Sequence, residues 1–503
     1  MPRRISRELK ALSVLALSLA LNGCIGFGGI GPKSQMLTAN TLATDEAIAS
    51  AAKDANWPKA QWWHAYGDPQ LDAWISLAVQ GSPSMAMAAA RVRQAKAMAG
   101  VAESAESLQI NADATLKRHN WPSDQFYGPG ALDNSTTWDN NAALGLSFAL
   151  DLWGRESNAT EQAVDMAHMS VAEARQAQLE LQNNVVRAYI QLSLHYAQLD
   201  ITESTLHQQE QILDLAQKRL DGGIGTHFEV SQAQAPLPEI HRQIDAQEEE
   251  IALTRNQLSA LAGKGPGEGA RLKRPTLALG TALKLPSVLP AELLGQRPDV
   301  VASRWQVAAQ ARGIDVAHAG FYPNVDLVGS IGFMATGGGA LSFLSGKKLN
   351  YNVGPAISLP IFDGGRLRSE LGVASGGYDM AVAKYNQTLV SALKGISDQL
   401  IKRESMEKQQ AFAVESVQAA QKTYDIAMVA FQRGLTDYLN VLNAQTLLFK
   451  QQQIEQQVQA ARLSAHAELV TALGGGLGAG NDVPKDDRYV PDKPPAVMAI
   501  FNP

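Results

Sequence analysis

The stretches DGGIGTHFEVSQAQ (221–234) and QRGLTDYLNVLNAQ (432–445) resemble each other, and each joins a glycine turn to a polar segment with helical spacing. They lie 211 positions apart. The same spacing separates LGLSFALDLWGR (144–155) from the last twelve residues of VGPAISLPIFDGGR (353–366). A single weak match carries little information, but one constant spacing at separate places indicates an internal repeat.

Each repeat begins with two segments in which apolar and polar residues alternate. They cover about 108–121 and 143–153 in the first repeat, and about 321–334 and 351–362 in the second. Alternation of this length predicts strands of a membrane barrel, with lipid on one side and water on the other. A soluble antiparallel sheet with one solvent-exposed face gives the same pattern. The residues expected on one apolar face are Ile110, Leu116, Leu144, Leu146, Phe148, Val325, Leu327, Ile331, Phe333, Tyr351, Val353 and Ile357.

Very long helices are predicted after each strand pair, at 155–221 and 366–433. A helix of this length spans about 100 Å, which exceeds an ordinary globular domain. Each ends at a glycine turn, and a second helix returns at about 227–263 or 437–473. Four strands cannot close a barrel, and membranes do not tolerate open sheet edges. The sequence therefore predicts an oligomer, if these are membrane strands.

The only cysteine lies in LALSLALNGC (15–24), behind a basic start and a short apolar run. This order predicts a signal peptide over residues 1–23. The residues before Cys24 resemble a bacterial lipobox, which implies cleavage before Cys24 and a lipid on Cys24, at the start of an N-terminal segment over 24–61. Ile25, in place of aspartate, implies sorting to the outer membrane. An ordinary signal with an incidental cysteine is the alternative.

The composition gives no indication of nucleic-acid binding or catalysis. The net charge is −6, so no basic surface for nucleic acid is expected. No catalytic constellation or cofactor motif occurs, and a nonenzymatic protein without cofactors is predicted. Met166, His168 and Met169 form a small group of soft ligands, as do Met85 and Met87. Such groups can select copper, but on helices they more often pack.

Longer motifs carry a family resemblance. WWHAYGDPQLDAWISLAVQGSPSMAMAAARVRQAKA (62–97) and LLGQRPDVVASRWQVAAQARGIDVAHAGFYPNVDLVGSIGF (293–333) resemble segments of TolC-type outer-membrane efflux proteins, in the lipoprotein branch labelled NodT or OprM-like. The two glycine-turn stretches complete the resemblance, which runs from Trp62 to Leu473.

The resemblance implies a homotrimer in which four strands from each chain build a 12-stranded barrel, continuous with a hollow helical barrel in the periplasm. The two repeats would be 62–263 and 291–473. The connection at 264–290 and the tail at 474–503 would form an equatorial belt. The implied partners are outer-membrane lipid, a periplasmic adaptor (membrane fusion) protein and an inner-membrane transporter.

The resemblance also implies a gate at the periplasmic end. The two acidic gate positions of the family fall on Asn440 and Asn443, so this chain has amides there. Leu439 matches a hydrophobic ring, Phe431 matches an aromatic near the turn, and Asp437 is a nearby acid that could replace part of the charge. Packing within an ordinary helix pair is the alternative for all five.

The turns themselves are expected to dock the adaptor, through Gly222, Gly223, Gly434 and Leu435. The predicted function is a passive exit duct of a tripartite efflux pump for drugs or other small toxic molecules. A duct for protein secretion and a copper efflux duct remain alternatives, as does a periplasmic coiled-coil lipoprotein without a pore.

Overall fold

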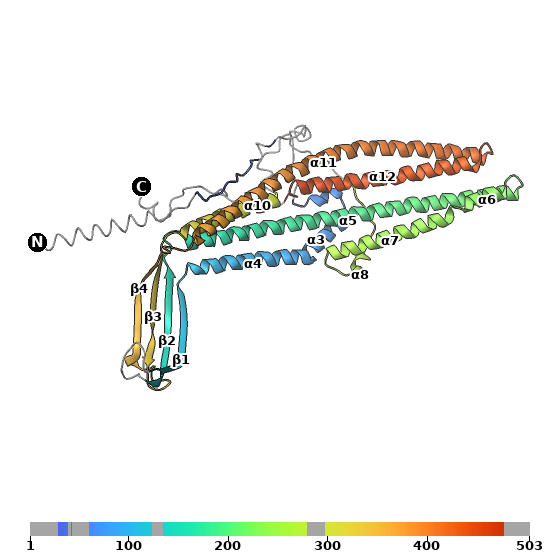
Figure 1. The fold of residues 1–503 in the computed structure, drawn as a ribbon. Helices are drawn as coiled ribbons and strands as arrows, with labels where there is room; N and C mark the ends of the chain where they lie inside the picture. The colour runs from blue at the N-terminus through green and yellow to red at the C-terminus, as the bar shows by residue number, and fades with distance from the viewer. Residues whose placement is uncertain (1–28, 39–41, 43–59, 123–133, 279–296, 477–503) are drawn as a thin grey trace.

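A computed structural model describes residues 29–38, 42, 60–122, 134–278 and 297–476. The predicted signal peptide, Cys24, most of the 24–61 segment, residues 279–290 of the expected belt and residues 477–503 of the tail lie outside these ranges. The described chain is an elongated bundle of long helices with a four-stranded sheet at one end (Figure 1).

The sheet contains β1 (Gln109–Trp121), β2 (Ser135–Ala149), β3 (Asn324–Thr336) and β4 (Leu349–Ser358), in the order β1-β2-β3-β4. All neighbours are antiparallel. Within the described residues, β1 and β4 each pair on one side only. The fold therefore leaves a free edge on each outer strand.

Cross-strand register brings the predicted apolar residues onto one face. Leu144 pairs with Ile331, and Ile331 in turn pairs with Tyr351. Ile110 pairs with Leu146 on the same face. The opposite face is polar and includes Asn111, Asp113, Asn141, Ser147, Asp326, Ser330 and Asn352. The alternation predicted for the four strands is confirmed.

Two strand limits differ from the prediction. The sequence predicted that this strand starts near 143, because the residues before that point are mostly polar. In the structure β2 begins at Ser135. Its first residues nevertheless continue the ladder with β1, and Trp121 Nε1 donates a hydrogen bond to Thr137 Oγ1 at 2.9 Å. β4 ends at Ser358, short of the predicted 362. Pro360 follows, and proline has no backbone N–H to continue the ladder.

The helices repeat in the same order around the strands. The first repeat has α4 (Pro83–Ala105), β1, β2, α5 (Arg155–Asp221), α6 (His227–Gln234) and α7 (Leu237–Leu261). The second has α10 (Pro298–Ala319), β3, β4, α11 (Arg366–Gln432) and α12 (Tyr438–Ala472). None of the described helices is both long and apolar enough to cross a bilayer.

One return helix is interrupted. The sequence predicted a return helix at about 227–263 that is bent by Pro236 and Pro238, and the structure divides it into α6 and α7, with Ala235 and Pro236 between them. Pro236 has no backbone N–H, which explains the break. The equivalent α12 has no proline and is continuous.

The core follows the bundle as separate clusters. Around the middle, η2 (Trp62–Tyr66) and α3 (Pro69–Gly81) pack against α5, α7 and α12. Asp68 fixes this region, because its carboxylate accepts hydrogen bonds from the Gln70 N–H, the Tyr189 hydroxyl and the Thr276 N–H at 2.8–2.9 Å. The short α8 (Pro266–Gly269) lies beside α7, and η3 (Gly346–Lys348) precedes β4.

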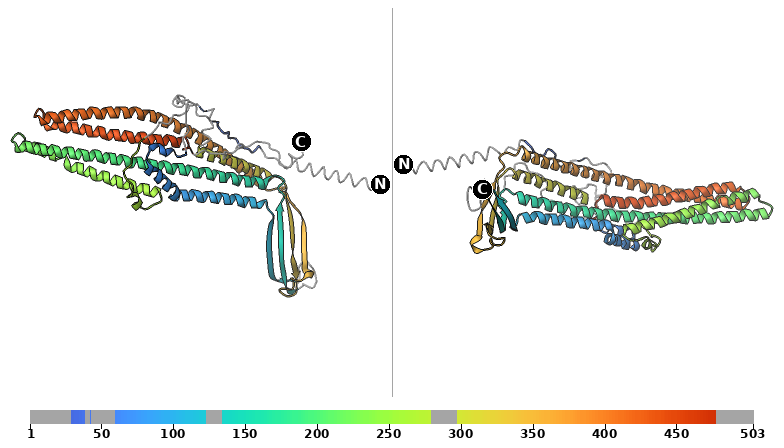
Figure 2. Two further views of the ribbon diagram at one scale, coloured as in Figure 1. Left: turned by 180° about the vertical axis from the view of Figure 1, so that it is seen from behind. Right: turned by 60° about the horizontal axis from the view of Figure 1, so that its bottom comes forward.

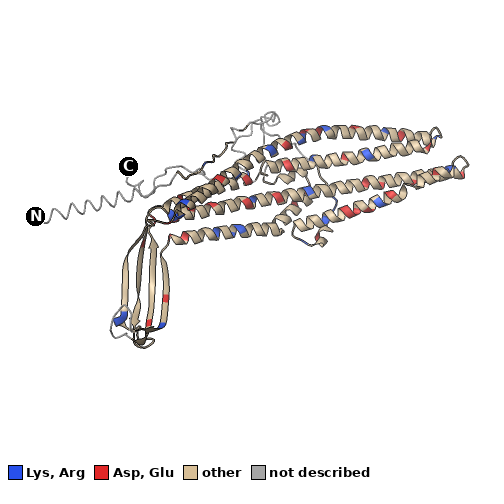
Figure 3. Ribbon diagram, in the orientation of Figure 1, with Lys and Arg blue, Asp and Glu red and all other residues tan. Residues whose placement is uncertain are grey.

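The two hairpins α5–α6–α7 and α11–α12 extend side by side to the far end of the bundle in all three views (Figures 1 and 2). Charged residues of both signs are scattered along these helices, whereas the strands carry few (Figure 3). The helical end and the sheet end therefore present chemically different surfaces.

Candidate functional site at the helical tips

The first tip is the turn between α5 and α6. Gly223 has φ +73°, which favours glycine, and a Cβ on Gly225 would meet the Leu220 nitrogen at 2.7 Å. α6 begins with a capping box: the Thr226 hydroxyl accepts from the Glu229 N–H, and the Glu229 carboxylate accepts from the Thr226 N–H. The turn is therefore closed by backbone geometry and by a reciprocal cap.

The second tip repeats this geometry between α11 and α12. Gly434 has φ +75°, and the Leu435 N–H donates to the Ala430 carbonyl oxygen at 2.9 Å. Asp437 caps α12 by accepting from the Asn440 N–H at 3.2 Å. The Asn440 amide also donates to Thr436 Oγ1 at 2.8 Å and to Asp437 Oδ1 at 3.0 Å. Asp437 and Asn440 thus take the places of Thr226 and Glu229.

The two hairpins are joined just behind the tips. The Arg219 guanidinium lies 5.0 Å from the centre of the Phe431 ring, and Arg219 Nη1 donates to the Phe431 carbonyl oxygen at 3.4 Å. Gln209 Nε2 donates to the Tyr438 hydroxyl at 2.8 Å and to the Ala233 carbonyl oxygen at 2.6 Å. These contacts couple the first hairpin to the second.

The buried cluster behind the tips includes Phe431, which corrects its predicted role as a gate residue. Its side chain is 0% exposed, and its ring lies 6.1 Å from that of Tyr438. The sequence placed Phe431 near the turn but could not show that Arg219 and Tyr438 cover it. Phe431 therefore packs the hairpins together rather than lining a surface.

The other predicted gate residues share an exposed face at the start of α12. Leu439 is 50% exposed, and Asn440 and Asn443 are exposed beside it. Asn443 lies three residues after Asn440 and four after Leu439, so the three follow one side of the helix. Asp437 is also exposed, but one of its carboxylate oxygens is used by the cap. The structure therefore brings four of the five predicted residues together.

The predicted docking residues Gly222, Gly223, Gly434 and Leu435 are exposed in the two turns. The prediction missed two further exposed apolar residues, Ile224 and Phe228. Applying the repeat spacing to Leu435 and Leu439 would have found them, because they occupy the equivalent positions in the first repeat.

The possible copper ligands do not converge. His168 stacks on Trp305 with ring centres 4.4 Å apart, and Met169 packs against a small apolar cluster that includes residues of α10. Met85 packs in the central core, whereas Met87 is exposed. Across the described part of the chain, no group of three or more His, Cys, Asp or Glu side chains is placed to hold a metal.

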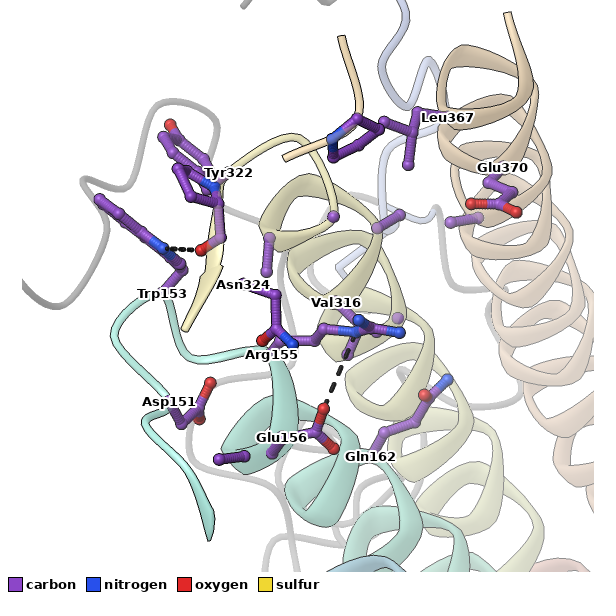
Figure 4. A pocket seen from close by; sticks show the side chains of 18 of the residues that line it. Asp151, Trp153, Arg155, Glu156, Gln162, Val316, Tyr322, Asn324, Leu367 and Glu370 are labelled. Carbon is purple, nitrogen blue, oxygen red and sulfur yellow. Dashed lines mark hydrogen bonds and ion pairs between the residues drawn. The ribbon is translucent and has the colours of Figure 1, made fainter. Parts of the chain in front are cut away.

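A cavity of about 830 Å³ lies at the other end, where the strands leave the helices (Figure 4). Trp153 stacks on Tyr322 with ring centres 4.7 Å apart and donates from Nε1 to the Pro323 carbonyl oxygen at 2.7 Å. Arg155 Nε lies 3.9 Å from Glu156 Oε1. Aromatic rings beside charged groups are typical of a membrane–water boundary.

Comparison with known proteins decides the family. The profile of the outer membrane efflux protein family matches residues 74–264 and 289–475, which include the helices and strands from α4 to α7 and from α10 to α12. The chain belongs to this family. As an outer membrane efflux protein, it is a passive channel that extends into the periplasm, and it is not an enzyme. The predicted family and fold class are confirmed.

Individual relatives of this efflux protein cover nearly all of it. It is 46% identical to the fusaric acid resistance protein FusA of Burkholderia cepacia, over 94% of this chain and 89% of FusA. It is 29% identical to the multidrug resistance outer membrane protein MdtP of Shigella flexneri, over 96% and 100% of the two chains. The crystal structure of the outer membrane protein VceC of Vibrio cholerae superposes with a TM-score of 0.78 at 32% identity, covering 84% of this chain and 100% of VceC.

Proposed function

We propose that this efflux protein is the outer-membrane duct of a tripartite pump for small toxic molecules. Three chains would join the free edges of β1 and β4 into a 12-stranded barrel, with the apolar face toward lipid. The observation that carries this proposal is the sheet itself: its face is continuous and apolar, and both edges lack a partner within the described chain. Closing the edges satisfies backbone groups that a bilayer cannot solvate.

The helical tips would form the periplasmic entrance. Leu439, Asn440 and Asn443 would constrict the pore, with Asp437 stabilising the helix start that presents them. Amide rings narrow a pore through size and hydrogen bonding, whereas rings of carboxylates focus a negative field. Gly222, Gly223, Gly434 and Leu435, together with Ile224 and Phe228, would form the surface that meets a periplasmic adaptor. An inner-membrane transporter would supply the energy.

Small molecules are favoured over secreted proteins as cargo. The relatives FusA and MdtP are named for resistance to fusaric acid and to multiple drugs. The candidate soft ligands do not converge, because Met87 is exposed while His168 packs on Trp305, and a copper efflux duct stays an alternative. The N-terminal segment would be anchored by lipid on Cys24, after removal of residues 1–23.

The test of the duct is complementation. A strain lacking its own outer-membrane efflux channel should regain dye extrusion when this chain is produced with its adaptor and transporter. The purified protein should run as a trimer that dissociates only on heating. A monomer in detergent, or a trimer without any transport of small molecules, would overturn the proposal. Growth on a copper series and assay of secreted proteins decide between the alternative cargoes.

A further inference from the structure

A short N-terminal segment, residues 29–38, lies against α11 without forming a helix or strand (Figures 1 and 2). We call it the strap. The N–H groups of Lys33 and Ser34 both donate to Asp379 Oδ1, at 2.9 and 2.7 Å. The strap is thus held to α11 by its backbone, which makes the contact independent of its own side chains.

Asn386 makes the second attachment, two helical turns further along α11. Its Oδ1 accepts from the Leu37 N–H at 2.8 Å, and its Nδ2 donates to the Gln35 carbonyl oxygen at 2.9 Å. One amide side chain therefore pairs with the strap as a neighbouring strand would, by donating and accepting at once.

The spacing of the two attachments matches an extended chain on a helix. From Asp379 to Asn386 the helix rises about 10.5 Å. From Ser34 to Leu37 an extended chain advances about 10 Å. The strap therefore runs parallel to α11 without slack between the attachments, and its N-terminal end points toward the start of α11, where the sheet begins.

Apolar contacts support the hydrogen bonds. Ile30 and Met36 of the strap, and Leu42 beyond it, pack against the buried cluster formed by α10, α11 and α12. The strap thus combines partly buried apolar side chains with hydrogen bonds of its backbone to Asp379 and Asn386.

We propose that Asp379 and Asn386 are positioning residues that clip the strap, so that the lipid anchor on Cys24 enters the bilayer beside the strands of its own protomer. This inference rests on the lipid anchor in the proposed function. Asp379 lies about 20 Å along α11 from Arg366. The ten residues from Cys24 to Ser34 can span up to about 36 Å. A ten-residue chain attached at Ser34 is therefore long enough to reach the membrane end of α11, and the clip fixes the point from which that reach is measured.

Protease sensitivity tests the clip. Trypsin cleaves after Lys33, whose neighbouring peptide groups are held by Asp379. In the full-length trimer, trypsin should cleave after Lys33 at least about tenfold faster in the double variant Asp379→Ala/Asn386→Ala than in the parent. Cleavage requires the strap to leave α11, and the variant lacks the side chains that hold it there. Asp379→Asn keeps the acceptor oxygen and should resemble the parent. Gln387→Ala, an exposed neighbour on α11, is the matched control. Equal cleavage rates for the parent and the double variant would overturn the clip.

A second measurement locates the strap directly. A Cβ on Gly31 would have no heavy atom within 4 Å, so a photoreactive benzoylphenylalanine fits there. In the parent it should crosslink to the part of α11 before Asp379, and the double variant should lose this product. Incorporation of labelled palmitate is measured in parallel and separates the two proposals. If palmitate is absent from the parent, the lipid anchor fails, while cleavage and crosslinking still decide the clip. If palmitate is present and crosslinking is unchanged in the double variant, the clip fails.

Discussion

Phe228 on α6 and Leu439 on α12 occupy equivalent positions in the two repeats, and both are exposed, at 68% and 50%. The same holds for Ile224 and Leu435 in the turns. In the proposed duct, Ile224 and Leu435 would both face the adaptor, whereas Leu439 would line the constriction and Phe228 the docking surface, so the repeat would use one apolar position in two ways. In a trimer each such pair would provide six apolar side chains around the entrance.

The turns should therefore contribute jointly to adaptor docking. Ile224→Asp and Leu435→Asp should each weaken adaptor binding, and the double variant should abolish dye efflux, because a carboxylate cannot be buried unpaired in an apolar contact. Copurification of the adaptor and dye extrusion measure the effect. Leu253→Asp, on an exposed apolar residue of α7, is the control. Normal adaptor binding by the double variant would contradict docking at the turns, provided that trimer yield is unchanged.

Charge at the constriction gives a separate prediction. Asn443→Asp adds three carboxylates to a trimeric ring and should raise cation preference and divalent-cation block in bilayer recordings. Gln232→Glu adds a charge at the equivalent position of the first repeat and serves as the control. The assignment of Asn443 to the pore fails if its variant has the selectivity of the parent, or if only the Gln232 variant changes it.

The contact between the hairpins should restrain opening. Arg219→Ala removes both the cation–π contact with Phe431 and the hydrogen bond to its carbonyl oxygen, together worth roughly 1–3 kcal/mol. The hairpins should separate more readily, so cells should become more sensitive to large hydrophilic antibiotics, and the single-channel conductance should rise. Arg242→Ala removes an arginine that pairs with Glu239 within α7 and should change neither. A leak of equal size in both variants would exclude a role for Arg219 as a restraint.

The constant spacing of the repeats allowed the architecture to be predicted, because glycine turns and period-2 strands depend on local sequence. The alternation at Leu144 and Leu146 specified a face before any partner strand was known. The polar start of β2 could not be predicted in the same way, since residues such as Thr136 join the sheet only because β1 extends opposite them, with Thr136 Oγ1 donating to Asn120 Oδ1 at 2.9 Å.

The candidate site was predictable only in part, for a related reason. Leu439 and Asn443 share a helix face by spacing alone. Burial of Phe431 depends on Arg219, which lies on another hairpin and has no equivalent arginine in the second repeat. The sequence of the strap has no hydrophobic periodicity. Its position follows from Asp379 and Asn386, which lie more than 340 residues away along the sequence.

Acid should weaken the middle of the bundle through His466. This side chain is buried, with its ring centre 5.6 Å from that of Tyr66. Burial, aided by the positive charge of Arg403, lowers the pKa of His466 to about 4, from an ordinary value near 6.5. The unfolded chain therefore binds a proton below about pH 6.5 that the folded chain binds only near pH 4. The contribution of His466 to stability should be complete above pH 6.5 and should fall as the pH is lowered to 4, by at most about 3 kcal/mol per protomer.

The variant His466→Phe isolates this contribution, because it keeps an aromatic ring against Tyr66 and removes the titrating group. Its thermal midpoint, followed by helical circular dichroism, should fall less between pH 7.5 and 4.5 than that of the parent. His207 is exposed on α5, and His207→Gln should retain the parental pH dependence. If His466→Phe also retains it, protonation at His466 does not limit acid stability.

Asp165 is a second buried group of the described residues whose titration falls in this pH range, and its effect has the opposite sign. Burial raises the pKa of Asp165 to about 6, so the folded chain takes up a proton there before the unfolded chain does. Protonation of Asp165 therefore favours the folded state as the pH falls. Asp165→Asn should accordingly steepen the loss of thermal stability between pH 7.5 and 4.5, whereas His466→Phe should reduce it. An unchanged or shallower loss in Asp165→Asn would show that the pKa of this carboxyl group is not raised in the folded chain.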